Sequence, residues 1–126
     1  ATSIAIWRFV PKEVPSVNLL KATSANCAAA PAPGVRWMGC DKRDASLAGA
    51  DLSRADLNNS ILTGADLSGT RLDSADMRNA DLRGADLQGA SLYEVQLAGA
   101  RLDEARWIDG RTCPPGSVGR CSAPAP

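Results

Sequence analysis

The strongest constraint on the fold is a five-residue unit that repeats fifteen times without interruption between Val35 and Asp109. The unit reads small–polar–Leu–polar–Gly or polar, as in Ala65-Asp66-Leu67-Ser68-Gly69. Leu occupies the central position in eleven units, and Ala stands two residues before the central position in ten. Any fold of this stretch must therefore bury an apolar pair once in every five residues.

A period of five fits neither regular secondary structure. In an α-helix a step of five residues turns each Leu by about 140° from the previous one, so no single apolar face forms. In a continuous strand side chains alternate with a period of two, so every second Leu would face water. The pattern is satisfied when a short extended segment points Ala and Leu inward and the chain then turns a corner. Repeated corners predict a solenoid with a narrow interior.

These units resemble the pentapeptide-repeat family, whose motif is A-(D/N)-L-x-x. The resemblance covers 75 of the 126 residues, including thirteen adjacent units from Ala45 onward. It implies an all-β fold, a right-handed quadrilateral β-helix with four units per coil. The repeat would then form fewer than four coils, and at about 4.8 Å per coil the rod would be about 18 Å long.

Four units per coil would place residues twenty apart on neighbouring rungs. This register stacks opposite charges in four pairs: Asp51 with Arg71, Asp81 with Arg101, Arg83 with Asp103, and Asp86 with Arg106. It also stacks like charges, Asp56 over Asp76 and Asp66 over Asp86. Opposite charges on neighbouring strands stabilise a sheet, although an exposed pair contributes at most about 1 kcal/mol.

The repeat divides the chain into three parts. We expect a non-repeat N-terminal segment at 1–34, the β-helix at 35–109, and a disulfide-closed cap and tail at 110–126. Lys42 stands at a central position, which predicts a distorted first coil with the ammonium group in solvent. Trp107 occupies the last central position and is expected to plug the final rung.

The N-terminal segment contains a candidate partner contact. Ser3–Val10 has the β-branched and aromatic content of a strand, and it ends at Pro11. Such a segment cannot bury its own large apolar side chains, which are Ile4, Ile6, Trp7 and Phe9. Two alternatives remain open. The segment caps the first coil, or these side chains anchor another protein.

The four cysteines form two local pairs at opposite ends of the repeat. Because a disulfide needs Cα atoms within about 7 Å, we expect Cys27 to pair with Cys40 and Cys113 with Cys121. Each bond would contribute roughly 2–3 kcal/mol by closing a short loop. A zinc site is disfavoured, because the chain has no His and no C-x2-4-C spacing.

Disulfides indicate an oxidising and therefore extracytoplasmic location, whether periplasmic, secreted or lumenal. The chain begins at Ala1 rather than Met, as expected after removal of a signal peptide. The sequences that open and close the repeat, V-x-W-x-G-C and W-x-D-G-R-x-C-x-x-G-S-x-G-x-C, are similar to those of exported bacterial members of the family. No stretch approaches the ~20 apolar residues that span a bilayer.

The residues of a catalytic or cofactor site are missing from the sequence. There is no His to act as a general base, no G-x-S-x-G motif and no Gly-rich phosphate loop. The recurring Gly residues suit corners, and the Asp before each Leu can accept backbone N–H groups there. Calcium would need six to eight oxygens converging on one point, which a flat wall does not supply. We therefore predict no enzyme activity, no cofactor and no metal.

Charge argues against nucleic acid as a target. Residues 35–109 carry 13 acidic and 9 basic side chains, a net of −4, while the remainder carries 5 basic and 1 acidic, a net of +4. Family members that protect DNA gyrase mimic duplex DNA, which carries roughly ten charges over 18 Å. This rod is too weakly acidic for such mimicry, and its balanced charge is equally unsuited to binding DNA. The basic ends of the chain are expected to fold against the acidic walls of the rod or to bind an acidic neighbouring protein.

The sequence thus predicts a non-enzymatic structural or accessory protein that mediates protein–protein interaction as a subunit of an extracytoplasmic assembly. Its partner would be another protein or a larger complex, and any peripheral membrane association would run through that partner. The alternative is a small regulator or inhibitor module.

Overall fold

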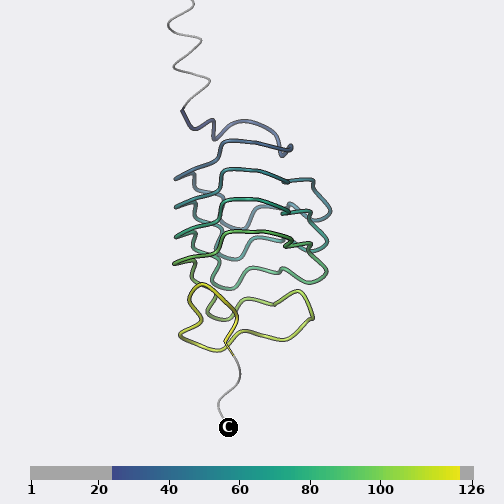
Figure 1. Cartoon of the computed structure of the whole chain (residues 1–126), viewed down its shortest axis with the longest axis vertical. Helices are drawn as coiled ribbons and strands as arrows, with labels where there is room; N and C mark the ends of the chain where they lie inside the picture. Colours follow the sequence, from purple (N-terminus) through teal and green to yellow (C-terminus); the bar gives the residue numbers. More distant parts are fainter. Residues whose placement is uncertain (1–23, 123–126) are drawn as a thin grey trace, which may run out of the picture.

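A computed structural model describes residues 24–122, which wind into a stack of coils (Figure 1). Within this range the chain has no helix and no continuous strand, and its rungs are joined by isolated β-bridges. Residues 24 and 122 lie at opposite ends of the stack (Figure 1). The predicted strand Ser3–Val10, with Ile4, Ile6, Trp7 and Phe9, lies outside the described residues.

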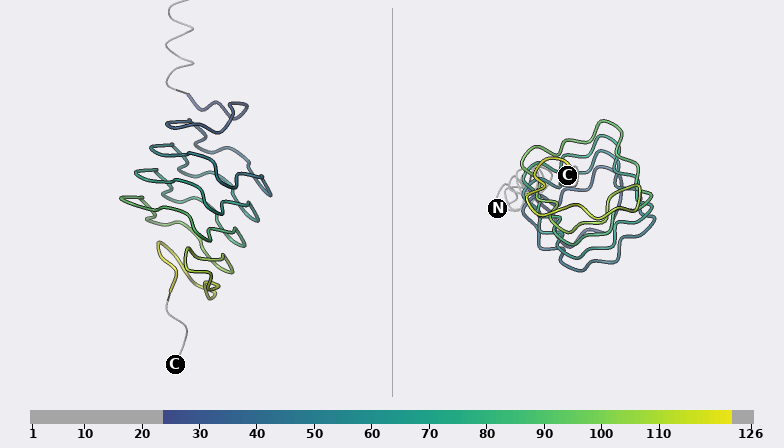
Figure 2. Two further views of the ribbon diagram at one scale, coloured as in Figure 1. Left: turned by 90° about the vertical axis from the view of Figure 1, so that its right-hand side faces the viewer. Right: turned by 90° about the horizontal axis from the view of Figure 1, so that it is seen from below.

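Parallel bridges join residues twenty apart, which confirms the predicted register. They define four faces, which we number by their bridge residues. Face 1 contains Arg36, Asp56, Asp76 and Gln96; face 2 contains Asp41, Ile61, Asp81 and Arg101; face 3 contains Ser46, Asp66, Asp86 and Arg106; face 4 contains Asp51, Arg71 and Ser91. An offset of twenty residues is four units, so each coil has four sides. The view along the stack shows this outline (Figure 2).

Each corner is a turn with a left-handed residue. The backbone N–H of Ala50 donates to the carbonyl of Leu47 at 3.1 Å, and equivalent bonds close the other corners. The fifth residue of the unit has a positive φ, for example 73° at Gly49 and 60° at Ser74. A turn with positive φ at its third residue favours Gly, because other residues are strained there. Seven of these positions carry a residue other than Gly.

We expect Ser74→Gly to raise the free energy of unfolding by about 0.5–1 kcal/mol. The substitution removes the strain of a side chain at positive φ, part of which is offset by the greater freedom of Gly in the unfolded chain. Ala48→Gly is the matched control, since Ala48 precedes the left-handed residue of its corner and its φ is not positive. It should lower stability by about 0.5–1 kcal/mol. Urea unfolding of both variants measures the effect, and equal shifts would contradict this account of the corner.

The interior of the coil is filled by the central side chains. Leu52, Leu67, Leu72, Met77 and their equivalents are almost completely buried, and the Ala two residues earlier lies in a small niche beside them. Thr70 occupies such a niche, where its hydroxyl donates to the carbonyl of Leu67 at 2.7 Å. A buried hydroxyl is tolerated there because it is hydrogen-bonded.

The predicted distortion at Lys42 is wrong. The first coil is regular there, because the backbone N–H of Lys42 donates to Ile61 at 2.7 Å as in other rungs. The side chain lies under the N-terminal loop, with Nζ 4.1 Å from the centre of the Trp37 ring and 2.6 Å from the carbonyl oxygen of Cys27. A cation over an aromatic ring that also binds a carbonyl is well satisfied without leaving the coil.

Candidate interaction surfaces

Residues 24–34 form a loop over part of the N-terminal end of the rod. Trp37, in the first predicted unit, is almost completely buried, and its Nε1 donates to the carbonyl of Ala29 at 3.2 Å. The backbone N–H of Asn26 donates to Arg36 at 2.7 Å. A disulfide between Cys27 and Cys40, with Cα atoms 5.5 Å apart, ties this loop to the first coil, as predicted.

The sequence analysis missed one unit in this loop. Residues 30–34 form the same corner as the repeat, since Val35 N–H donates to Ala32 at 3.1 Å and Gly34 N–H to Ser53 at 2.8 Å. The unit reads Ala-Pro-Ala-Pro-Gly. Only its first residue, Ala30, and its last, Gly34, match the repeat motif. Pro31 stands where other units have an N–H that bonds to the coil above. Proline at that position leaves this unit without a donor, which protects this part of the sheet edge from further pairing.

The C-terminal end is half covered. Residues 112–118 run antiparallel below the last coil, with bridges from Arg101 to Val118 and from Arg106 to Thr112. The predicted disulfide between Cys113 and Cys121 closes this segment, and both cysteines are buried. Trp107 is partly buried and packs against the core, so it fills the last rung less completely than predicted. Faces 2 and 3 therefore have a covered lower edge.

In the described part of the chain, faces 1 and 4 have no bridged rung below their last coil, although Gly119 of the cap lies beside Leu97 and Gly99 on face 1. One coil higher, the backbone N–H groups of Leu72 and Met77 donate to Ser91 and Gln96, both at 2.8 Å. Within residues 24–122 the corresponding N–H groups of the last coil have no hydrogen-bond acceptor; they belong to Leu92, Glu94, Leu97 and Gly99. We call these four residues the open edge. It offers backbone donors in the spacing of a sheet edge.

Apolar side chains gather around the open edge. Tyr93, between two of its residues, is 71% exposed, and Val118 on the adjoining cap is 55% exposed. Ile108, in the last unit, is also exposed. Leu92 and Leu97 are only half-buried, whereas the central residues above them are fully buried. The C-terminal end thus combines unpaired backbone with exposed apolar surface, a combination typical of interaction sites.

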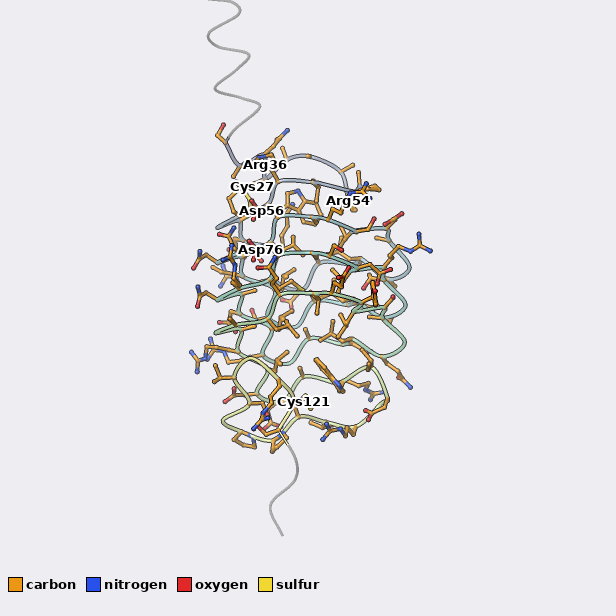
Figure 3. All side chains as sticks on the ribbon, in the orientation of Figure 1. Cys27, Arg36, Arg54, Asp56, Asp76 and Cys121 are labelled. Carbon is orange, nitrogen blue, oxygen red and sulfur yellow. A yellow bond between two sulfur atoms is a disulfide. The ribbon has the colours of Figure 1, made fainter. Side chains whose placement is uncertain are left out.

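The walls carry a regular pattern of aspartates that serve the corners, as predicted. In three units the Oδ1 of the Asp accepts the backbone N–H two residues later at 3.0 Å: Asp51 from Ser53, Asp66 from Ser68, and Asp86 from Gln88. This Asx arrangement supports the turn locally. On face 1, Arg36, Asp56 and Asp76 lie one above another (Figure 3).

The ion pairs differ from those predicted. The stacked residues are neighbours in register, but each ion pair seen within residues 24–122 joins an Asp and an Arg two residues apart in sequence. Arg78 lies 2.7 Å from Asp76, and Arg83 lies 2.6 Å from Asp81. Both side chains stand on the same side of one short rung, and the Arg backbone N–H binds the same carboxylate. These arginines therefore form ion pairs within their own unit and not with the neighbouring rung.

These contacts shift the acidity of the carboxyl groups. The hydrogen bonds from Arg78 hold the pKa of Asp76 below the ordinary value of 3.8, although partial burial opposes the effect. Arg83 lowers the pKa of Asp81 in the same way. A carboxylate with a lowered pKa contributes stability above the unfolded-state pKa, and this contribution is lost as the pH falls through the folded-state pKa.

We therefore expect the free energy of unfolding to fall as the pH drops from about 5 toward 2. The double variant Asp76→Asn, Asp81→Asn should show a shallower decline, because Asn still accepts the backbone N–H but does not titrate. Urea unfolding between pH 2 and 7 measures the slope. Gln88→Ala, which changes no carboxylate, is the control and should keep the parent profile. A double variant with the parent slope would contradict the assignment.

Metal-binding clusters and membrane-spanning helices are both absent from the described residues. Between residues 24 and 122 no group of three or more His, Cys, Asp or Glu side chains is placed to hold a metal ion. In the same range no helix has the length and apolar character to cross a membrane. What the described residues offer to a ligand is backbone hydrogen bonding, flat walls and apolar surface.

Comparison with known proteins supports the fold. A family model described as "Pentapeptide repeats (8 copies)" matches residues 43–79 and 71–106, about half of the chain. No curated protein matches the chain in sequence. Pentapeptide repeat proteins are in general non-enzymatic modules that interact with other proteins.

Solved structures of pentapeptide repeat proteins are also similar. HetL, involved in heterocyst differentiation regulation in the cyanobacterium Nostoc sp. strain PCC 7120, is 38% identical over 59% of this chain, with a TM-score of 0.32. A thylakoid lumen protein of Arabidopsis thaliana is 20% identical over 65% of this chain, with a TM-score of 0.32. Rfr23 of the cyanobacterium Cyanothece 51142 is 30% identical over 54% of this chain, with a TM-score of 0.27.

The matched regions cover 35% of HetL, 78% of the Arabidopsis protein and 60% of Rfr23. This chain thus spans about a third of the length of HetL. The repeat motif, the twenty-residue register and the family match agree. The chain belongs to the pentapeptide-repeat family, and its coil is the right-handed quadrilateral β-helix of that family.

Proposed function

We propose that this protein is a non-enzymatic scaffold or accessory subunit of an extracytoplasmic assembly, which it joins by binding another protein. The observation that carries the proposal is the difference between the two ends of the rod. The N-terminal end carries a disulfide-anchored loop over Trp37, although the N–H groups of Asp41, Ser46 and Asp51 have no acceptor within residues 24–122. The open edge presents four such N–H groups, and exposed apolar side chains lie on the last coil and its cap. A short rod of about four coils with exposed apolar side chains at its C-terminal end suits docking onto a partner.

The rungs define what the partner must supply. Each inner rung forms three backbone hydrogen bonds to the rung above, in which two of its carbonyls accept and one of its N–H groups donates. On face 4, Arg71 accepts from Leu52 at 2.8 Å, Asp73 accepts from Arg54 at 2.8 Å, and Arg71 N–H donates to Ala50 at 2.9 Å. A partner that adds an extended segment below Leu92 and Leu97 would reproduce these bonds. This mode is β-strand addition, in which the main chain gives affinity and side chains give specificity.

The covalent chemistry supports the proposed location. Two disulfides are stable in an oxidising compartment and rare in the cytosol, which supports a periplasmic, secreted or lumenal site. Removal of a signal peptide remains part of this proposal. The division of the chain into an N-terminal segment, a β-helix and a C-terminal cap after residue 109 is also part of the proposal, with the β-helix extended from residue 35 back to residue 30. A second contact through Ile4, Ile6, Trp7 and Phe9 belongs to it as well.

The open edge can be tested with three substitutions on the end of the rod. The protein is mixed with the extracytoplasmic fraction of its source and analysed by native mass spectrometry. We expect a complex of fixed stoichiometry that the combined variant Tyr93→Ser, Ile108→Ser, Val118→Ser abolishes. Ile61→Ser removes a comparably exposed side chain from face 2 and should keep the complex. A free monomer throughout, or equal loss in both variants, would contradict the proposal.

The N-terminal contact needs its own variant. Trp7→Ala, Phe9→Ala should weaken the same complex if the segment anchors the partner, because aromatic anchors dominate interface energetics. Retained affinity in this variant would remove the segment from the interface while leaving the open edge in place.

A further inference from the structure

The two disulfides differ in how a reductant can reach them. Cys27 is exposed, although its partner Cys40 is buried. Cys113 and Cys121 are both buried beneath the last coil. Thiol–disulfide exchange requires a thiolate to approach one sulfur directly, so access decides which bond reacts first. The Cys27–Cys40 bond is accessible from its Cys27 side, and the Cys113–Cys121 bond is shielded.

The loop that Cys27 anchors has few other contacts. Residues 24–28 are exposed, and of the loop's apolar side chains only Ala29 packs against the core. Polar contacts join the loop to the first coil: Asn26 N–H to the carbonyl of Arg36, Trp37 Nε1 to Ala29, and Lys42 Nζ to Cys27. The covalent bond is therefore the main constraint that keeps this loop over Trp37.

The first coil does not need that bond for its own pairing. Arg36 bridges Asp56 and Asp41 bridges Ile61 in the coil below. Cys40 itself occupies a niche that Ala fills in most units, so its thiol would fit there. Opening the loop would leave the rod intact.

We infer that Cys27–Cys40 is a redox-sensitive clasp, which a dithiol of the thioredoxin class opens in the folded protein while Cys113–Cys121 stays closed. A thiolate of the reductant attacks Cys27 Sγ and forms a mixed disulfide, and Cys40 leaves as a thiolate that takes up a proton. The second thiol of the reductant then attacks the mixed disulfide and releases Cys27. The protein gains two electrons and two protons, and the reductant becomes a disulfide.

The length of the loop that the bond closes supports this role. The bond closes a loop with a sequence separation of 13, so its loss should raise the ratio of open to closed loop on the order of a hundredfold. Opening would uncover Trp37.

Stepwise reduction tests the difference between the two bonds. The native protein is incubated with dithiothreitol or with reduced thioredoxin, free thiols are trapped with iodoacetamide, and peptides are mapped by mass. We expect Cys27 and Cys40 to be labelled at least tenfold faster than Cys113 and Cys121, with the circular dichroism of the rod unchanged. Equal labelling rates, or labelling only together with loss of the circular dichroism signal, would overturn the inference.

Trp37 reports whether the loop opens. In a variant with Trp7→Phe and Trp107→Phe, Trp37 is the remaining Trp of the three in the chain. Reduction should shift its emission to the red and raise quenching by acrylamide several-fold. The variant Cys27→Ser, Cys40→Ala should show the same emission without reductant. An unchanged Trp37 signal in both experiments would show that the bond does not hold the loop, whether or not any partner binds the other end.

Discussion

Leu67→Ala is expected to lower the free energy of unfolding by about 3 kcal/mol. Leu67 is fully buried and lies between Leu47 and Leu87 on the inner side of face 3. Its backbone is fixed by bonds to both neighbouring rungs, since its N–H donates to Asp86 at 2.7 Å and Asp66 N–H donates to Ala45 at 2.9 Å. The rungs cannot collapse into the space that the side chain leaves, so a cavity should remain.

Urea unfolding followed by circular dichroism measures this loss. Domains of this size are stable by only about 5–15 kcal/mol, so the effect should be easy to detect. Ser68→Ala, on the outer side of the same rung, is the control and should change stability by less than about 1 kcal/mol. A Leu67→Ala variant within 1 kcal/mol of the parent would show that the interior is not tightly packed.

Cys113→Ala, Cys121→Ala is expected to lower stability by about 2–3 kcal/mol, because the bond closes a short loop that becomes free in the unfolded chain. The effect should extend beyond the loop. Its backbone pairs with the last coil, where Leu102 N–H donates to Ser117 at 2.8 Å and Glu104 N–H to Cys113 at 2.9 Å. Loosening the cap would expose the lower edges of faces 2 and 3 and favour aggregation.

Thermal unfolding and light scattering test both consequences. The matched control is Cys27→Ser, Cys40→Ala, which removes the bond at the other end. We expect a smaller change in global unfolding there, because the N-terminal loop can open while the coils stay paired. A C-terminal double variant that unfolds and scatters like the parent would show that the cap folds without its disulfide.

The repeat could be predicted from the sequence because one geometric rule governs it. A period of five with Ala and Leu inside demands a corner after each rung, and the resemblance to a known motif supplied four units per coil. Both disulfide pairs followed from proximity at the two ends. These inferences rest on local spacing, which the sequence carries directly.

The rest depended on contacts that spacing does not encode. Lys42 looked like a defect because its ring contact with Trp37 and its bond to the Cys27 carbonyl require the folded loop above them. The unit at 30–34 was missed because its central residue is Ala and two of its residues are Pro. Arg78 and Arg83 form ion pairs with an Asp of their own unit instead of one on a neighbouring rung. The side-chain rotamers, which the register does not fix, decide which carboxylate each Arg reaches.

The open edge could not be predicted from the sequence either. The repeat is as regular at Leu92 and Leu97 as in the middle of the rod. Which faces lack a lower neighbour is decided by the path of residues 110–122, which turn back under faces 2 and 3.

Amide hydrogen exchange of the free protein, resolved by residue, tests the central claim most directly. We expect slow exchange at Leu62, Leu67 and Leu72, whose N–H groups are bonded to the rung below, and fast exchange at Leu92, Glu94, Leu97 and Gly99. Uniform protection along all four faces, including the open edge, would contradict the account of a rod whose last coil lacks a paired rung below faces 1 and 4.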